Sequence, residues 1–103
     1  MSRYKIAKEA RQDIKEIYRH IVSANPSAAG RLYDLFYDKF RMLANNPLLG
    51  EKREDLAENL RMFTAGNYGI LYRPAKNGIE IIQIVHSARD LPALWSSSKR
   101  NPQ

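Results

Sequence analysis

The segment RMFTAGNYGILYRPAKNGIEIIQIVHSARD, residues 61–90, decides the fold of this chain. It contains three short runs of the residue types that favour strands, and these runs are Arg61–Ala65, Tyr68–Arg73 and Ile79–His86. Gly66-Asn67 and Asn77-Gly78 separate the runs. Asn and Gly tolerate the positive φ that both central positions of a two-residue hairpin turn require. The segment therefore predicts a three-stranded antiparallel meander.

The last run of this segment is apolar on both faces. Its β-branched residues are Ile79, Ile81, Ile82, Ile84 and Val85. Such a pattern is typical of a strand that is covered on both faces or paired on both edges. The middle run alternates instead, with Tyr68, Ile70 and Tyr72 on one face. The rest of the chain must therefore cover the meander.

Two amphipathic helices are predicted before the meander. The first covers Lys8–Ala24, where apolar residues recur at steps of three and four. Asn25-Pro26 ends this helix and begins the second, because Asn is a favourable N-cap and Pro is favourable at the first helical position. The second helix ends at Asn45-Asn46-Pro47. The short break between the two helices indicates an α-helical hairpin that packs on the meander.

Two further segments leave alternatives open. Ser2–Ala7 alternates polar and apolar residues and is either a first strand or the lead-in to the first helix. Leu48–Leu60 mixes both signs of charge and is either a solvated loop or a short helical turn. The length predicts a single α+β domain over residues 1–95, followed by a flexible tail at 96–103.

Composition excludes several classes of site. The chain has no cysteine, which excludes disulfides and zinc-thiolate sites and fits a cytoplasmic protein. No signal peptide, membrane span, cofactor fingerprint or metal-ligand pattern is evident, so we predict neither a cofactor nor a metal. The formal net charge of +6 is compatible with nucleic acid or an acidic protein as partner, but basic residues run along the whole chain, and charge alone favours a merely solvated basic surface.

One set of residues could support chemistry if the meander forms. The basic members are Arg61, Arg73, His86 and Arg89, and the aromatic members are Tyr68, Tyr72 and Trp95. Arginines stabilise phosphates, histidine moves protons near neutral pH, and aromatic rings stack on bases. Arginines on a sheet also commonly pair with carboxylates, and Asp90 adjoins Arg89. Residue type alone favours structural pairing over ribonuclease chemistry.

The order of the motifs resembles a known family over nearly the whole length. The motifs are Ala10, Asp13 and Ile17 in the first helix, NPLLG at Asn46–Gly50, Leu60-Arg61, GNYGILYR at Gly66–Arg73 and IVHSARD at Ile84–Asp90. In this order and spacing they resemble the ParE toxins of the ParE/RelE toxin superfamily. The resemblance implies an α+β fold with an N-terminal strand, a helical hairpin and a three-stranded antiparallel meander.

The resemblance also implies a function. ParE-type members are the toxins of type II toxin–antitoxin systems and poison DNA gyrase rather than acting as enzymes. Their antitoxin supplies an acidic or amphipathic segment, extended or helical, that wraps the toxin. The complex binds operator DNA through the antitoxin. The alternatives are a ribosome-dependent messenger-RNA endoribonuclease of the RelE type, and a non-toxic member that retains only antitoxin binding.

The RelE alternative has incomplete motifs in this chain. Arg89 matches the arginine that follows the last strand in those enzymes, but Trp95 stands where they have a tyrosine, and Thr64 stands where they have an arginine. Those enzymes also have a pair of lysines in the preceding loop. This chain has no convincing match for that pair, because Lys52 stands far off, together with Arg53. If the protein were a ribonuclease, we would expect its catalytic residues to be Arg61, His86 and Arg89.

The expected contact residues follow from these readings. For the cellular target they are Arg73, Arg89 and Trp95. For the antitoxin they are Tyr33, Tyr37, Arg61 and Phe63, where the two tyrosines form an aromatic strip that serves either as a partner-binding face or as packing. A free strand edge at Arg61–Ala65 or Ser2–Ala7 could accept an added strand from the antitoxin.

Overall fold

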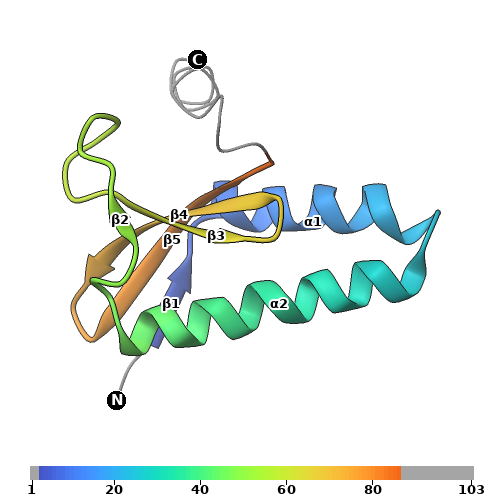
Figure 1. Cartoon of the computed structure of the whole chain (residues 1–103), viewed down its shortest axis with the longest axis horizontal. Coiled ribbons are helices and arrows are strands. Elements are labelled where there is room, and N and C mark those ends of the chain that lie inside the picture. Colours follow the sequence, from blue (N-terminus) through green and yellow to red (C-terminus); the bar gives the residue numbers. More distant parts are fainter. Residues whose placement is uncertain (1–2, 87–103) are drawn as a thin grey trace.

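The computed structural model describes residues 3–86 of the 103. Its elements are β1 (Arg3–Ile6), α1 (Lys8–Val22), α2 (Pro26–Asn45), β2 (Glu51–Lys52), β3 (Arg61–Ala65), β4 (Tyr68–Ala75) and β5 (Gly78–Val85). The two helices form an antiparallel hairpin that lies along one side of the sheet (Figure 1). The predicted α+β fold is confirmed, and Ser2–Ala7 does contain a strand.

The strands form one sheet in the order β1-β5-β4-β3-β2. β1 runs parallel to β5, with Ile6 opposite Ile81, whereas β3, β4 and β5 form the predicted antiparallel meander. β5 is therefore paired on both edges as far as Ile81, and its apolar residues are covered on both faces, Ile81 and Ile84 by the larger core cluster and Val85 by the smaller one. The parallel pair requires a crossover connection, and the helical hairpin provides it.

Strand β2 is an element that the sequence did not predict. Glu51 pairs with Met62 and Lys52 pairs with Arg61, where we expected a solvated loop or a helical turn. The backbone N–H of Arg53 then donates to the carbonyl of Leu60 over 2.8 Å. A two-residue edge strand with exposed side chains carries no apolar period that a sequence pattern could reveal.

The turn between β4 and β5 is shifted by one residue from its predicted place. Ala75 pairs with Gly78, so the central residues are Lys76 and Asn77 rather than Asn77 and Gly78. Asn77 has a φ of 66°. Gly78 is required for a different reason, because a Cβ there would lie 1.7 Å from the carbonyl oxygen of Arg3. The glycine thus allows β1 to pair beside the turn.

The main core lies between the helices and the sheet. Its largest fully buried side chains on the helices are Phe36, Phe40 and Leu43 of α2. The start of α2 determines which of its residues face the sheet. There the Oδ1 atom of Asn25 accepts a hydrogen bond from the N–H of Ala28 at 3.1 Å, and Pro26 occupies the first turn. The predicted cap and helix boundary are confirmed.

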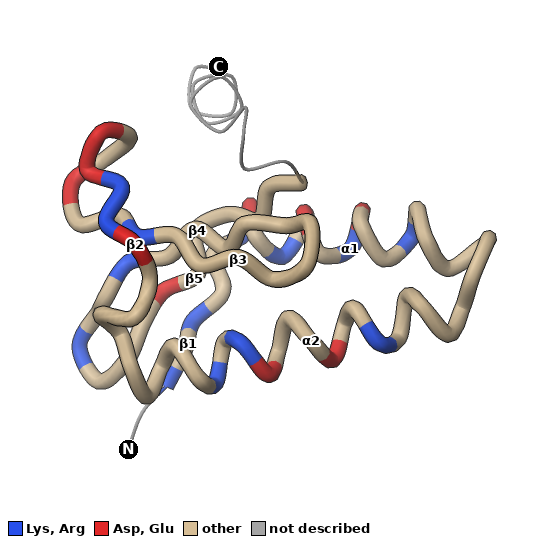
Figure 2. Tube along the Cα trace, viewed as in Figure 1, with Lys and Arg blue, Asp and Glu red and all other residues tan. Residues whose placement is uncertain are grey.

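A smaller cluster lies on the opposite face of the sheet. Leu60, Leu71 and Val85 are buried there, and Leu56 and Ala57 from the segment between β2 and β3 pack against them. That segment contains residues of both charge signs (Figure 2). Within residues 3–86, neither helix is long and apolar enough to cross a membrane.

Candidate functional site

Tyr72 on β4 holds the loop between α2 and β2. Its side chain is fully buried, and its hydroxyl accepts from the N–H of Gly50 at 2.7 Å and donates to the carbonyl of Pro47 at 2.8 Å. Burial raises the pKa of the phenol above its usual value. Tyr72 therefore cannot stack on a base, and its inclusion among the aromatic residues that could do so was wrong.

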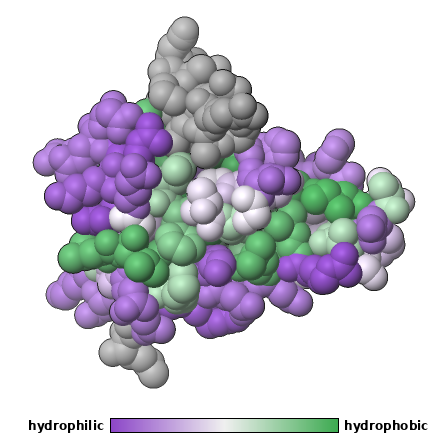
Figure 3. Space-filling model, viewed as in Figure 1, coloured by the Kyte–Doolittle hydropathy of each residue, from purple (hydrophilic) through white to green (hydrophobic). Residues whose placement is uncertain are grey.

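Arg61 on β3 holds the same loop from the neighbouring strand. Its Nη1 atom donates to the carbonyls of Leu48 and Gly50 at 3.1 and 2.6 Å. Leu48 and Leu49 are turned outward, with 70% and 52% of their surfaces exposed. Arg61 and Tyr72 thus hold the backbone of this loop against the sheet, while the side chains of Leu48 and Leu49 face solvent. Figure 3 shows apolar surface where α2 ends and β2 begins.

Lys52 lies directly opposite Arg61 in the β2–β3 pair. Both side chains line a hollow of about 420 Å³ whose other walls include Leu48, Glu54 and Pro74. Like charges on facing positions of two strands repel each other. The facing of Lys52 and Arg61 was not predicted, because the sequence did not reveal β2.

Arg73 and His86 lie away from this hollow. Arg73 follows Tyr72 along β4, so it points to the opposite face of the sheet, where it is opposite Glu80. His86 is exposed, and its ring centroid lies 4.9 Å from that of Tyr68. Arg61 pairs with Tyr72, which is four positions after Tyr68 along β4. At the usual rise of a strand, the backbones of Tyr68 and Tyr72 are roughly 13 Å apart. The structure does not bring Arg61 and His86 together.

A groove of about 600 Å³ runs between the two helices near the end of the hairpin. Its lining residues are Ile14, Lys15, Tyr18, Arg19 and Val22 from α1, and Gly30, Tyr33 and Asp34 from α2. Tyr18 and Tyr33 are 40% and 45% exposed. No neighbouring atom lies within 4 Å of the place where a Cβ on Gly30 would stand, so this glycine keeps the groove open. Figure 3 shows apolar surface over the hairpin.

The predicted aromatic strip of α2 divides into two roles. Tyr33 lies 4.8 Å from Tyr37 between ring centroids and 6.0 Å from Tyr18 across the groove. Tyr37 packs inward against Tyr4 and Phe40, at 6.2 and 5.1 Å. Burial, together with the neighbouring Tyr33, raises the pKa of Tyr37 to about 12. Tyr37 is therefore mainly a packing residue, whereas Tyr33 is available to a partner.

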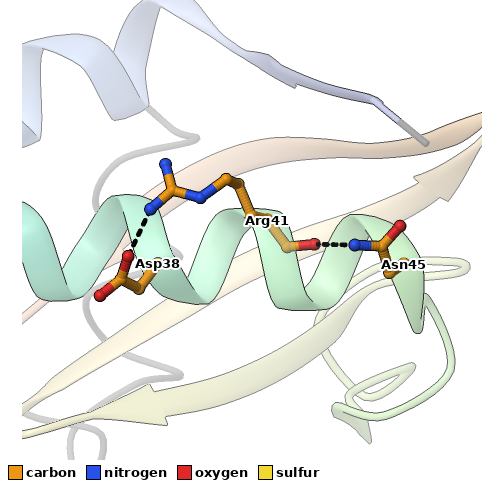
Figure 4. A network of polar contacts seen from close by, with 3 residues as sticks. All are labelled: Asp38, Arg41 and Asn45. Atoms are coloured by element: carbon orange, nitrogen blue, oxygen red, sulfur yellow. Dashed lines mark hydrogen bonds and ion pairs between the residues drawn. The ribbon is translucent and has the colours of Figure 1, made fainter. Parts of the chain in front are cut away.

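Charges at the groove are unpaired within the described part of the chain, whereas those farther along α2 are partly matched. Asp38 and Arg41 form an ion pair on the exposed side of α2, and Asn45 donates to the carbonyl of Arg41 at 3.1 Å (Figure 4). By contrast Lys15 and Arg19 line the groove without a carboxylate partner among residues 3–86. The groove combines apolar walls with a basic margin on α1.

In the described part of the chain, the two outer edges of the sheet have stretches without a neighbouring strand. β2 pairs only with Arg61 and Met62, so β3 from Phe63 to Ala65 pairs with β4 on one edge and has no strand on its outer edge within residues 3–86. β1 forms the other edge of the sheet. Phe63 is partly buried against the core, and the Lys39 ammonium lies 5.8 Å from its ring centroid. Over the same residues, no group of three His, Cys, Asp or Glu side chains could hold a metal ion.

Comparison with known proteins identifies the family. The family model described as the ParE toxin of type II toxin–antitoxin system, parDE, matches residues 4–91. The chain belongs to the ParE toxin family. Toxin RelE3 of Caulobacter vibrioides (strain ATCC 19089 / CIP 103742 / CB 15) is 30% identical over 88 residues, which span 84% of this chain and 96% of the relative.

A solved structure supports the same fold. A chain titled as the chromosomal ParDE TA system from P. aeruginosa superposes with a TM-score of 0.71 at 21% identity, covering 84% of this chain and 97% of the other. The predicted membership of the ParE/RelE superfamily is therefore confirmed. The protein is a toxin of the type II toxin–antitoxin class, and this class implies an antitoxin partner.

The residues expected to contact partners are only partly described. Arg89 and Trp95 lie outside the described residues. Arg73 is partly buried on the helix-free face, so it does not share a face with Arg61. The sequence analysis missed Tyr18 and Gly30 as groove residues. Tyr18 lies beside the apolar stripe of α1, so the sequence pattern does not distinguish it from a packing residue. The role of Gly30 follows only from the position of α1 beside α2.

Proposed function

We propose that this ParE-family protein inhibits DNA gyrase in the cytoplasm and is neutralised when a cognate antitoxin binds it. The family match over residues 4–91 supports a toxin. The observation that favours a binding mode of action over catalysis is that Arg61 pairs with Tyr72, whereas His86 lies beside Tyr68, which is roughly 13 Å away from Tyr72 along the backbone of β4. General acid–base catalysis requires groups within hydrogen-bond reach of one reacting atom, and these two side chains are not.

The groove between α1 and α2 is the proposed antitoxin site. Its exposed tyrosines, Tyr18 and Tyr33, provide apolar walls, and the opening above Gly30 gives room for a large side chain. Lys15 and Arg19 at its margin favour an acidic partner. These features fit an amphipathic helix that inserts apolar residues every three or four positions and carries Asp or Glu beside them. The open edge at Phe63–Ala65 could add a strand from the same antitoxin. Operator DNA would be bound by the antitoxin half of the complex.

Two substitutions test the groove from opposite directions. Tyr33→Ala removes a wall, and Gly30→Leu fills the space above α2. Each should weaken antitoxin binding about tenfold to a hundredfold, measured by calorimetry, because both reduce the apolar contact at the centre of the interface. Leu48→Ala is the matched control, since Leu48 is exposed but lies outside the groove. Unchanged affinity in both groove variants would place the antitoxin elsewhere.

The mode of toxicity can be read in cells. Induction without antitoxin should relax plasmid DNA on chloroquine gels and arrest growth, while primer extension detects no new transcript ends. Discrete transcript cuts with unchanged plasmid topology would contradict gyrase inhibition. Normal growth at high expression would instead indicate a member that retains only antitoxin binding.

A ribosome-dependent endoribonuclease is the second candidate, and one observation favours it. Lys52 and Arg61 face each other across β2 and β3 and line one hollow, an arrangement able to bind a phosphate between two cations. A 30% identical relative is also named as a RelE toxin. Lys52→Ala tests this candidate more cleanly than a change at Arg61, because Arg61 also holds the loop. A ribonuclease should lose transcript cleavage in this variant, whereas a gyrase inhibitor should remain toxic.

A further inference from the structure

The charges of α1 are divided between two sides of the helix. Its basic residues recur at steps of three and four and form one stripe, which consists of Lys8, Arg11, Lys15 and Arg19. Its acidic residues form a second stripe at steps of four and three, which consists of Glu9, Asp13 and Glu16. At about 100° per residue, the two stripes are roughly a third of a turn apart. The helix therefore has a basic side and an acidic side in addition to its buried side.

The two charged sides of α1 face different parts of the molecule. The Oδ2 atom of Asp13 accepts a hydrogen bond from the backbone N–H of Ile84 at 3.0 Å, so the acidic stripe lies toward β5. Lys15 and Arg19 line the groove between α1 and α2, whereas the acidic stripe lies outside its lining. The side of the groove that α1 forms is therefore positively charged.

The basic stripe continues past the groove toward the start of α1. Burial raises the pKa of Tyr37, on α2, and the positive charge of Arg11 opposes this rise. Arg11 therefore lies on the side of α1 that faces α2, as Lys15 and Arg19 do. From Arg11 to Arg19 the stripe extends along the helix axis by roughly 12 Å, which is more than two helical turns. A helix bound along the groove would meet this charge over much of its length.

The opposite margin of the groove carries a negative charge. Asp34 lines the groove from α2, about one helical turn after Gly30. Its side chain is exposed, and like Lys15 and Arg19 it forms no ion pair with another residue of the described chain. The groove thus has apolar surface between a basic margin on α1 and an acidic margin on α2. The charges of both margins are available to a bound partner.

We propose that Asp34, opposite Lys15 and Arg19, is a specificity-determining residue that selects a partner helix with acidic residues on one flank and basic residues on the other, and that fixes the direction of this helix. The partner helix is the antitoxin helix of the proposed function, on which this inference rests. The inference adds a requirement for basic residues and a direction, and it does not depend on the cellular target.

The fixed direction follows from the geometry of a helix in a groove. When its apolar stripe points into the groove, one flank of the bound helix lies beside α1 and the other beside α2. Reversing the helix exchanges the flanks, because the apolar stripe must still face the groove. One direction places acidic residues beside Lys15 and Arg19 and basic residues beside Asp34. The other direction places like charges together at both margins, which disfavours it.

Model peptides that differ only in their flanks test the selection. Each is a stapled helix with the same apolar stripe; the mixed peptide has one acidic and one basic flank, and the acidic peptide has two acidic flanks. At low salt the wild type should bind the mixed peptide about threefold to tenfold more tightly, measured by fluorescence anisotropy. Asp34→Lys should prefer the acidic peptide instead, and Asp34→Asn should show little preference. At about 1 M salt these differences should disappear, because charges are then screened within roughly 3 Å.

Glu16→Lys is the matched control for Asp34→Lys. It makes the same change of net charge at an exposed residue that lies outside the groove. This variant should keep the preference of the wild type for the mixed peptide. If Asp34→Lys does not fold by circular dichroism, Asp34→Asn removes the charge with little change in size and tests the same role.

The direction is measured with a nitroxide label at the N-terminus of the mixed peptide. Paramagnetic broadening of amide signals should occur at one end of the groove, near either Ile14 or Val22. A peptide with the two flanks exchanged should bind with similar affinity and broaden signals at the other end. Broadening at the same end by both peptides, or at both ends by each, would overturn the fixed direction.

Failure of this inference is distinguishable from failure of the proposed function. Equal affinity of the wild type for the mixed and acidic peptides, or an unchanged preference in Asp34→Lys, would overturn the role of Asp34 and leave the groove as a helix site. If the wild type binds none of the peptides, the groove does not hold an amphipathic helix, and the proposed antitoxin site is wrong together with this inference.

Discussion

At the scale of single residues, three polar side chains form hydrogen bonds between segments that are distant in sequence. Tyr72 and Arg61 hold the loop of residues 47–50 against β3 and β4, and Asp13 holds the end of β5 against α1. Each makes its bonds to backbone groups. The interactions therefore fix the path of the chain, which a contact between two flexible side chains would do less well.

Removal of the Tyr72 hydroxyl should loosen the loop. Tyr72→Phe leaves the ring in the core but leaves the Gly50 N–H and the Pro47 carbonyl without this partner. We expect the free energy of unfolding to fall by about 1–3 kcal/mol, measured by urea denaturation. Tyr18→Phe, on an exposed tyrosine of the groove, should change it by less than about 0.5 kcal/mol. Equal effects in the two variants would mean that the buried hydroxyl does not hold the loop.

The charge of Asp13 should make stability depend on pH. Because burial raises its folded pKa to about 6 from the ordinary value of 3.8, its contribution is most favourable below about pH 4 and is lost as the pH rises through 6. Asp13→Asn removes this dependence. The variant should therefore gain stability relative to the wild type between pH 4 and pH 7, by roughly 1–2 kcal/mol after allowance for solvent screening. A constant difference in urea unfolding across this range would show that Asp13 does not titrate as described.

At the scale of elements, β1 and the β4–β5 turn depend on one another. The N–H of Arg3 donates to the Asn77 carbonyl at 2.8 Å, and the backbone of Arg3 lies against Gly78. Asn77 supplies the positive φ that the turn needs, and Gly78 supplies the space that the parallel strand needs. The dipeptide therefore serves two elements that are adjacent in space and distant in sequence.

Gly78→Ala should displace β1 from the sheet. The added methyl would meet backbone atoms of Arg3, which cannot move as a side-chain end could, and Gly78 has a φ of 154°. We expect a loss of roughly 2–4 kcal/mol in the free energy of unfolding, and faster hydrogen exchange in β1 than in β3. Gly66→Ala is the control, because its φ of 62° is also positive but the space around it is open. A smaller effect at Gly78 than at Gly66 would contradict this account of the β1 contact.

At the scale of the whole molecule, the elements with a periodic apolar pattern were predictable from the sequence, whereas contacts between segments distant in sequence were not. The helices, their Asn25-Pro26 boundary and the three main strands follow from apolar spacing, capping and turn residues. Strand β2 has two charged residues and no period, so nothing in Glu51-Lys52 distinguishes it from a loop. The facing of Lys52 and Arg61, the burial of Tyr72 and the groove above Gly30 each arise from segments that meet only in the folded chain.

The molecule as a whole presents separate surfaces to different partners in this account. The hairpin groove, with Tyr18 and Tyr33, is the surface proposed for the antitoxin, and it lies near the start of α2, whereas the loop of residues 47–50 follows the end of α2. An antitoxin that occupies the groove can neutralise the toxin by covering the target surface or by restraining it. Either route requires that the free toxin acts on its target by binding.

The most direct test of this claim is a supercoiling assay with purified DNA gyrase. The toxin is freed from its antitoxin by denaturation and refolding, and the refolded sample must bind antitoxin again. We predict that added toxin inhibits supercoiling or accumulates cleaved DNA, and that equimolar antitoxin restores activity. Full gyrase activity at a large excess of refolded, antitoxin-competent toxin, together with cleavage of messenger RNA on purified ribosomes, would contradict it.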